Sequence, residues 1–401
     1  MKCSGSSQKH YSYFEFGCQL TKIAWEAIFL PVSLSIPQQR SPPSSAWPQD
    51  GLESVARCPV CGSHQREPLY ESLQDRVFFC APGKWILQRC LSCGSGFLDP
   101  RPNVATISEA YRDYYTHGQV PSEPMVPRGL RRKFRLALRN GYLNARYGCH
   151  FAPSSALGPV LYSLYSAARR HQADRWVRNL YFPKGPPRLL DLGCGNGHFL
   201  VEMRACGWEV YGSEPDIRAV EACRKVGLQV QAGMLAEDTF LPGFFAAITL
   251  NHVIEHLHDP LATLRLCFKF LQPGGTLWIA TPNLKALGHT RFGRNWFALD
   301  PPRHLILFTP ASLRAALEQA GYEVAPRLLR GGGAKWHFRV SEALAKGRDP
   351  LNAPGHSFFQ KWRLKREARR ADRQTAIQPE LTEEIVMLAT KPSAPAGQSD
   401  T

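Results

Sequence analysis

Apolar runs of strand length recur along the middle of the chain, and each is closed by glycine, proline or a polar residue. The first, residues 188–192, ends at a cluster of glycines, and residues 198–203 then continue with helical spacing. Similar runs follow at residues 208–212, 246–251 and 271–283. Continuous apolar runs of this length are typical of buried parallel strands. The pattern therefore predicts an α/β protein with a buried central sheet.

The glycine cluster has the sequence D-L-G-C-G-N-G at residues 191–197. Glycines allow a ligand to approach the backbone closely, and the helix that follows offers free N–H groups. A dinucleotide fingerprint requires G-x-G-x-x-G, but Gly197 comes one residue too early for that spacing. Asp191 introduces a carboxylate that a zwitterionic amino-acid ligand can use. The turn thus indicates a nucleotide-type cofactor other than a dinucleotide.

An acidic residue follows the second predicted strand. Glu214 lies about 20 positions after the glycines, where a carboxylate at a strand end suits a ribose diol. The alternative is that Glu214 is a solvated acid in a loop.

Two more motifs follow in order, Glu255-His256 after the fourth strand and L-x-P-G-G-x-L at residues 271–277. With the glycine turn and the E-P-D at residues 214–216, they make the chain resemble class I S-adenosylmethionine-dependent methyltransferases. It is most similar to the group that includes ubiquinone-biosynthesis O-methyltransferases. The resemblance covers residues 187–322 and implies a Rossmann-like seven-stranded sheet in the order 3-2-1-4-5-7-6, with its last strand at residues 384–390.

The resemblance also implies S-adenosyl-L-methionine as the methyl donor. The residues that it assigns to the cofactor are Asp191, Gly193 and Gly195 at the methionine part, Glu214 at the ribose, Gly233, Met234 and Leu235 beside the adenine, and Asn251 and His252 near the sulfonium. One departure is Ala246, which stands where related proteins usually carry Asp. We expect this change to affect local stability rather than the cofactor site.

A second departure is chemical. Ubiquinone-pathway enzymes tend to carry E-x-x-E-H after the fourth strand, which can hold a divalent metal, whereas this chain has His252-x-x-Glu255-His256. Alone, H-x-x-E-H suggests an inverted zinc peptidase, but that motif belongs within a helix and this one begins at a strand end. A catalytic metal remains one interpretation. We favour a His–Glu cluster that orients cofactor and substrate.

Aromatic and polar residues concentrate after the fifth strand, in the pattern W-F-x-L-D-P-P-R-H-L at residues 296–305. Such a loop predicts a substrate lid. A hydroxyl or amine acceptor benefits from a base with a pKa near 7, for which histidine is the usual residue. His304 and His252 are therefore the catalytic candidates. The alternative for each is a structural histidine bonded to the backbone.

Ahead of the glycine turn, two pairs of cysteines have the spacing C-x2-C, 28 residues, C-x2-C, and each pair is followed by glycine. Cys58, Cys61, Cys90 and Cys93 thus predict a zinc-ribbon-like module with a structural Zn2+, because four thiolates complete a tetrahedron. Iron is an alternative metal, and Cys80 is a spare ligand. The remaining cysteines show no regular spacing, so we expect a reducing, cytoplasmic setting.

The net charge of +16 is unevenly distributed. Residues 188–330 hold 14 Lys/Arg and 13 Asp/Glu, whereas residues 121–180 hold 11 and 2. Residues 361–373 add a net +5. Such clusters attract anionic partners, including a membrane surface, nucleic acid or a nucleotide-linked substrate. The alternative is a solvated helix face.

These observations predict the organisation of the chain. The expected segments are a disordered leader (1–50), a zinc-ribbon-like module (51–115), a basic helical connector (116–182), the methyltransferase core (183–330), a basic helical insertion (331–378), the final strand (379–392) and a disordered tail (393–401). No apolar run is long enough to span a bilayer.

The predicted activity is O-methylation of a small-molecule, glycan or lipid-linked acceptor, with peripheral contact to an anionic membrane through the basic segments. The alternative is an RNA methyltransferase guided by the zinc ribbon. The fourth strand ends without the N-P-P-Y or D-P-P-Y tetrad of many base N-methyltransferases, which weighs against that alternative.

Overall fold

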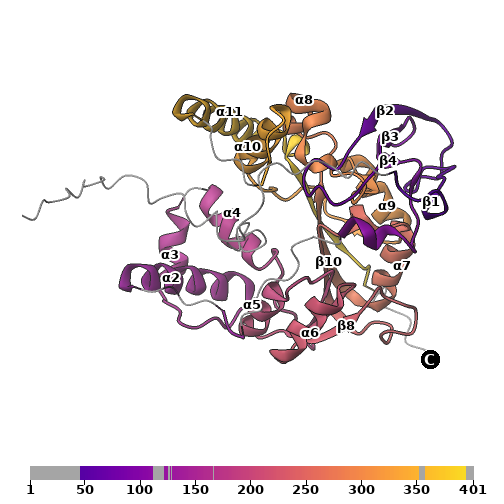
Figure 1. The fold of residues 1–401 in the computed structure, drawn as a ribbon. Helices are drawn as coiled ribbons and strands as arrows, with labels where there is room; N and C mark the ends of the chain where they lie inside the picture. The colour runs from indigo at the N-terminus through magenta and orange to yellow at the C-terminus, as the bar shows by residue number, and fades with distance from the viewer. Residues whose placement is uncertain are drawn as a thin grey trace, which may run out of the picture.

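The computed structural model describes residues 46–111, 122–124, 127, 129–165, 167–351 and 357–393. Most of the predicted leader and the tail from residue 394 lie outside these residues. A seven-stranded sheet forms the centre of the molecule (Figure 1). Its strands are β6 (Arg188–Leu192), β7 (Glu209–Glu214), β8 (Gln229–Ala232), β9 (Phe245–Asn251), β10 (Leu271–Pro282), β12 (Glu323–Val324) and β13 (Glu384–Thr390).

The strands lie in the order β12-β13-β10-β9-β6-β7-β8. Numbered along the chain within this sheet, the order is 3-2-1-4-5-7-6, so the predicted topology is confirmed. The five strands from β8 to β10 are parallel, and β13 is antiparallel between β10 and β12. Because parallel strands end at the same edge, the segments after β6, β7 and β9 come together there.

Side-chain caps begin the helices soon after several of these strand ends. Asp216 accepts a hydrogen bond from the Arg218 backbone at the start of α6 (Ile217–Lys225), and Asp259 caps α7 (Pro260–Phe270). Thr309 and Ser312 form a capping box at α9 (Pro310–Gln319). Such caps satisfy backbone N–H groups that lack partners within the helix. They fix where each helix leaves the edge of the sheet.

The cysteine-bearing front segment shares a second sheet with the core. This four-stranded sheet has the order β11-β4-β3-β2, and β11 comes from the core, after β10. Its strands are β2 (Arg66–Leu73), β3 (Trp85–Cys90), β4 (Gly96–Leu98) and β11 (Ile306–Leu307), while β1 (Leu52–Glu53) and β5 (Arg101–Pro102) pair separately. Trp47 is buried against Trp85, so the packed front segment begins before residue 51.

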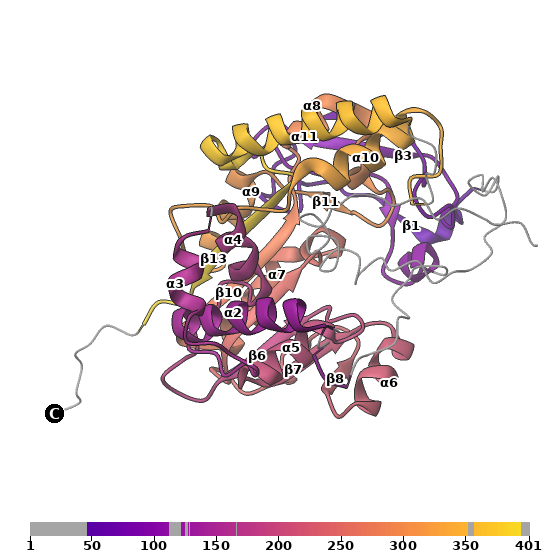
Figure 2. The same ribbon diagram turned by 90° about the vertical axis from the view of Figure 1, so that its left-hand side faces the viewer.

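Five helices from two separate stretches of the chain lie on one side of the central sheet, at the left of Figure 1 and facing the viewer in Figure 2. They are α2 (Leu130–Tyr147), α3 (Gly158–Ser163), α4 (Ala167–Trp176), α10 (Ala334–Ala345) and α11 (Phe358–Ile377). The segment predicted as a basic helical connector (116–182) contains α2, α3 and α4. Among the described helices, none is long and apolar enough to cross a membrane.

The remaining elements are short and connect these units. They are α5 (His198–Cys206), α8 (Leu287–Phe292) and the 3-10 turns η1 (Gln49–Gly51), η2 (Ile107–Tyr111), η3 (Ile254–His256), η4 (Gly293–Asn295), η5 (Phe297–Leu299) and η6 (Pro379–Leu381).

Candidate functional site

In the glycine turn between β6 and α5, the space beside Gly193 is filled by a side chain, whereas the space beside Gly195 is open. Gly193 has φ 67°, and a Cβ there would lie 2.5 Å from Val253 Cγ2. Gly195 has φ 53°, and no atom lies within 4 Å of the position of its missing Cβ. Both positions favour glycine because residues with side chains rarely adopt positive φ. The backbone at Gly195 therefore offers a ligand a place of close approach.

Asp191, at the base of the turn, holds a buried arginine. Its carboxylate forms an ion pair with Arg178 and accepts a hydrogen bond of 2.8 Å from Thr249 Oγ1. The guanidinium lies 3.5 Å from the centre of the Phe199 ring. Asp191 is 2% exposed and Arg178 is 7% exposed, so both charges depend on this pairing.

The sequence pattern did not reveal Arg178. It follows α4 within the basic stretch of residues 121–180, where nothing separates one buried arginine from its exposed neighbours. Its burial follows only from the tertiary contacts that bring it to Asp191 on β6 and Thr249 on β9.

Glu214 lies at the end of β7, next to the glycine turn. Its Oε2 accepts a hydrogen bond of 2.8 Å from the Gly195 backbone, and its Oε1 accepts one of 3.0 Å from Asp216. Burial raises the pKa of Glu214, while these two N–H donors act in the opposite direction. The structure brings Glu214 and the turn together, as the sequence predicted.

The segment predicted to lie beside the adenine follows β8. Gly233 has φ 89°, and a Cβ there would meet no atom within 4 Å. Met234 is 49% exposed, whereas Leu235 packs against the main core. The segment therefore offers an open backbone and an exposed apolar side chain at the same edge of the sheet.

His252 directly follows Asn251, the last residue of β9, and links two buried carboxylates. Its Nδ1 lies 3.2 Å from Glu255 Oε1, and its Nε2 lies 3.3 Å from Glu384 Oε1. Burial alone would lower the pKa of His252, but the bonds to these carboxylates outweigh it and raise the pKa to about 10. The two carboxylates thus favour the protonated ring.

The same contacts act on the carboxylate side. Burial would raise the pKa of Glu255, but the hydrogen bond and charge of His252 lower it to about 2. Glu384, which the sequence reasoning did not assign to the site, also pairs with Arg175 of α4 at 3.0 Å. It belongs to β13, more than 100 residues away, which no local pattern connects to His252.

His304, the other catalytic candidate, is 8% exposed and lies near the same cluster. Its Nδ1 lies 2.8 Å from the Ala298 carbonyl oxygen, so this nitrogen carries the proton and donates it. In the neutral ring, Nε2 can then accept a proton. Donor atoms of Glu255, His256 and His304 lie within 4.8 Å of one another and could hold a divalent ion.

The loop after β10 is packed into the interior, contrary to the expected substrate lid. Trp296 is 1% exposed and donates a hydrogen bond of 3.0 Å to Glu383. Arg303 is fully buried and forms ion pairs with Asp75 at 2.7 Å and Asp300 at 2.6 Å. A buried guanidinium is stable only when it is paired with carboxylates. Because Asp75 belongs to the front segment, its ion pair with Arg303 holds the loop against that segment.

The four predicted cysteine ligands converge. All four Sγ atoms lie within 4.8 Å of one another, with Cys58 3.7 Å from Cys93 and Cys61 3.5 Å from Cys90. A tetrahedral ion with sulfur ligands at about 2.3 Å requires separations of about 3.8 Å. The donor set and its spacing therefore fit Zn2+.

Cys80 does not join this cluster. Its thiol lies 3.2 Å from the Ala110 carbonyl oxygen and 3.6 Å from Asp75 Oδ2. The suggestion that it could serve as a spare ligand was wrong, because β3 separates it from the paired turns.

Known proteins match the part of the chain that carries the glycine turn. Residues 165–326 match the family model described as a methyltransferase domain. A ubiquinone biosynthesis O-methyltransferase of Xanthomonas campestris pv. campestris (strain B100) is 36% identical over 106 residues, covering 24% of this chain and 43% of that protein. Another, of Aromatoleum aromaticum, is 29% identical over 154 residues, covering 35% and 66%.

Two solved structures are similar at lower identity. A SAM-dependent methyltransferase from Archaeoglobus fulgidus is 17% identical with a TM-score of 0.35, covering 56% of this chain and 95% of that chain. A SAM-dependent methyltransferase from Thermotoga maritima is 18% identical with a TM-score of 0.34, covering 56% and 96%.

The sheet order and the glycine turn at the end of its first strand define a cofactor-binding α/β domain. With the family match, they identify residues 165–326 as a methyltransferase domain of the class I S-adenosylmethionine-dependent type. The chain spans less than half the length of the first curated relatives that it matches.

Proposed function

We propose that the protein transfers a methyl group from S-adenosylmethionine to an oxygen of a small-molecule, glycan or lipid-linked acceptor. The observation that carries this proposal is the grouping of Asp191, the open backbone at Gly195 and Glu214 at one edge of the sheet. The named activity of the ubiquinone biosynthesis O-methyltransferases supports oxygen as the acceptor atom.

The residues present fit S-adenosylmethionine. Gly193 and Gly195 would lie along its methionine part with Asp191, Glu214 would bind the ribose, and Gly233 would pass the adenine. When bound, the cofactor supplies an electrophilic methyl group on a sulfonium. Transfer from a sulfonium depends mainly on in-line positioning, so the protein's main task is to orient the acceptor.

His252 and His304 would have different roles in the reaction. His252 is held protonated by Glu255 and Glu384, so it supplies a fixed positive charge and a hydrogen bond instead of acting as a base. The neutral ring of His304 has an unprotonated Nε2, because its proton is on Nδ1 and is donated to the Ala298 carbonyl oxygen. We assign to His304 the removal of the acceptor's proton.

Zn2+ at Cys58, Cys61, Cys90 and Cys93 would have a structural role, since four thiolates leave no open coordination position. The front segment shares its sheet with β11 of the core and encloses Arg303. These contacts support a module that completes the domain. They give no specific support to the alternative of an RNA methyltransferase guided by the zinc ribbon.

Titration calorimetry with S-adenosylmethionine and its demethylated product tests the cofactor site. Glu214→Ala should weaken binding by about 1–3 kcal/mol, because the ribose hydroxyls lose a charged acceptor. Glu221→Ala, an exposed acid on α6, is the matched control and should bind as the parent protein does. Unchanged affinity in Glu214→Ala would remove the ribose assignment.

The acceptor can be sought by untargeted metabolite profiling of a deletion strain. The strain should accumulate an unmethylated compound, and the parent gene should restore its methylated form. The His304→Gln gene should fail to restore it while the purified variant still binds S-adenosylmethionine. Full restoration by His304→Gln would exclude the base assignment.

A further inference from the structure

The outward face of α11 combines aromatic and basic side chains. Leu364, Ala368 and Ala371 turn inward, and the opposite side of the helix begins with Phe358 and Phe359, each 78% exposed. The rest of that side consists of a tryptophan and basic residues, which also line a shallow hollow: Trp362, Lys365, Arg366, Arg369, Arg370 and Arg373.

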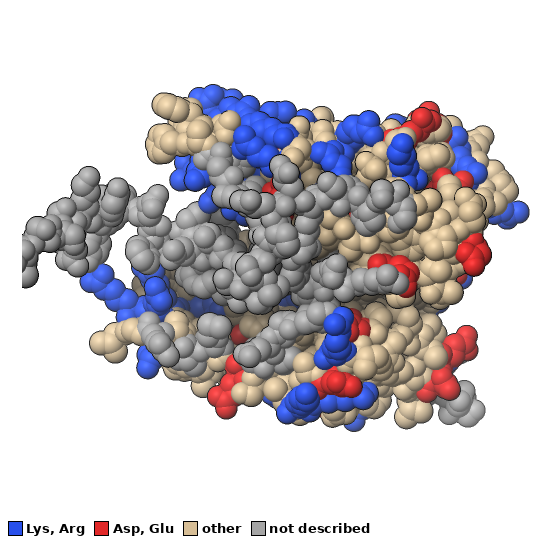
Figure 3. Space-filling model, viewed as in Figure 1, with Lys and Arg blue, Asp and Glu red and all other residues tan. Residues whose placement is uncertain are grey.

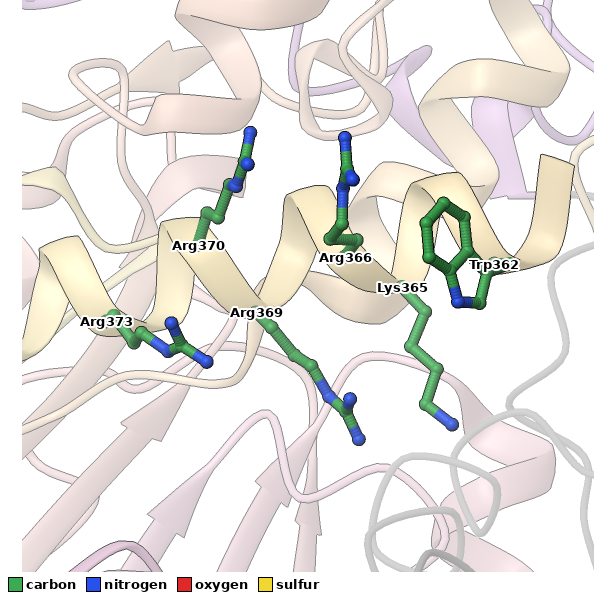
Figure 4. A pocket seen from close by; sticks show the side chains of 6 residues that line it. All are labelled: Trp362, Lys365, Arg366, Arg369, Arg370 and Arg373. Carbon is green, nitrogen blue, oxygen red and sulfur yellow. The ribbon is translucent and has the colours of Figure 1, made fainter. Parts of the chain in front are cut away.

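Figure 4 shows how these basic groups spread around the helix. Arg366 and Arg370 extend to one side of α11, and Lys365, Arg369 and Arg373 extend to the other. The Arg366 guanidinium also lies 5.0 Å from the centre of the Trp362 ring. Basic side chains extend to both sides of α11, and aromatic side chains lie at its start. The helix can therefore lie flat on an anionic surface.

The first two turns of α2 have the same character. Leu130 is 87% exposed and Phe134 is 54% exposed, and between them lie Arg131, Arg132 and Lys133. Residues Leu130–Tyr147 contain no acidic side chain. Beside α2, the α3 segment exposes Leu157, Val160 and Leu164 by 58–76%.

These exposed residues share one side of the molecule. In Figures 1 and 2, α2 and α3 lie at the lower end of this side and α11 lies at its upper end, and Lys and Arg gather over α11 and along α2 in Figure 3. We call this side, formed by α2, α3 and α11, the basic–apolar face. Of the large hydrophobic side chains exposed in the described residues, more than half belong to these three helices or their ends.

The basic–apolar face is connected to the candidate site through Glu384. Arg175 of α4, which packs beside α2 and α3, forms an ion pair with Glu384 at 3.0 Å. From the other direction, the Gly332 backbone donates a hydrogen bond of 2.8 Å to the same carboxylate, just before α10 and its partner α11. Glu384 also contacts His252. The α2–α4 helices and the α10–α11 pair are therefore both linked to the candidate site through Glu384.

We propose that the basic–apolar face docks on an anionic lipid bilayer, so that the methyl acceptor is a lipid-linked molecule presented at the membrane surface. Aromatic and aliphatic side chains would enter the interfacial layer, and the arginines would neutralise lipid phosphates. Nucleic acid would use the charges but would not require the aliphatic residues of α2 and α3. This inference deepens the proposed function and rests on it for the nature of the acceptor.

Vesicle flotation of the full chain tests the docking surface. The probes are vesicles of phosphatidylcholine alone and of equal parts phosphatidylcholine and phosphatidylglycerol. The protein should float with the anionic vesicles only, and binding should fall steeply as salt is added, because surface attraction is screened within about 8–10 Å. Equal binding to both vesicles, or to neither, would overturn the proposal.

Two variants separate the contributions of α11. Phe358→Ser/Phe359→Ser/Trp362→Ser and Arg366→Glu/Arg369→Glu/Arg370→Glu should each weaken partitioning by at least about tenfold. The matched control is Val104→Ser/Leu241→Ser, which alters two side chains that are each 72% exposed outside the face and should bind normally. Tighter binding to RNA, lost only in the arginine variant, would instead identify a nucleic-acid surface.

Calorimetric affinity for S-adenosylmethionine is measured on every variant. Normal cofactor binding without vesicle binding would exclude the membrane inference and leave the methyltransferase proposal intact. Vesicle binding without cofactor binding would instead contradict the methyltransferase proposal and leave the membrane-docking surface intact. Circular dichroism spectra of the α11 variants that match the parent spectrum would show that neither result is caused by misfolding.

Discussion

The front segment and the basic–apolar face use charge in opposite ways. In the front segment, Arg303 is fully buried between Asp75 and Asp300, and β4 pairs with β11 of the core. On the face, Arg366, Arg369, Arg370 and Arg373 of α11 are exposed. Buried charges are costly unless they are paired, whereas exposed charges contribute little to folding.

This difference indicates what each region does. A region that buries a doubly paired arginine and shares strands with the core depends on the rest of the fold and supports it. A region whose charges face outward gains little stability from them, and its charges are available for contact with another molecule.

The largest effect should come from the cysteine cluster. Cys58→Ser/Cys90→Ser should abolish binding of one zinc per chain, measured by elemental analysis, and lower the free energy of unfolding by several kcal/mol. Cys149→Ser is the control, since that thiol lies outside the cluster. Full zinc occupancy in the double variant would show that these cysteines are not the site.

Removing the buried guanidinium should have the next largest effect. Arg303→Met leaves Asp75 and Asp300 buried without a cation and should lower the free energy of unfolding by about 3–5 kcal/mol in denaturant titrations. Arg89→Met, in the same segment, removes an exposed arginine that is 3.8 Å from Glu67 and should cost less than about 1 kcal/mol. Similar losses in the two variants would contradict the contrast.

A buried carboxyl without a cation should make stability depend on pH. Burial raises the pKa of Glu383 to about 7, above its ordinary value near 4.5 in the unfolded chain. Its contribution is therefore complete below about pH 4.5 and is lost as the pH rises through 7. Relative to Glu383→Gln, the parent protein should lose up to about 3 kcal/mol between pH 5 and 8.

Thermal or denaturant unfolding across this pH range measures the difference. Glu380→Gln, at an exposed neighbouring position, should follow the parent curve at every pH. Parallel curves for the parent and Glu383→Gln would mean that Glu383 titrates normally.

The smallest effect is expected on the face itself. Arg369→Glu and Arg373→Glu should each change the free energy of unfolding by less than about 0.5 kcal/mol, because both side chains point into solvent. A loss comparable with that of Arg303→Met would show that α11 is held in place by its charges.

Local patterns were sufficient for the sheet and for the parts of the site that lie directly after its strands. Apolar runs identified β6, β7, β9 and β10, whereas β13 was placed by the family resemblance, and the parallel strands bring their carboxyl ends to one edge. For this reason Glu214 and the glycine turn could be predicted to meet. The cysteine spacing was likewise sufficient to bring four sulfur atoms together.

Only the tertiary structure determined which charges are buried. Arg178 and Arg303 are ordinary arginines in the sequence, and their partners Asp191 and Asp75 lie 13 and 228 residues away. Glu384 reaches His252 across 132 residues, because β13 enters the sheet antiparallel beside β10. Hydrophobic periodicity encodes which segments are interior, but the pairing of distant charges depends on how the completed layers pack, which no local pattern records.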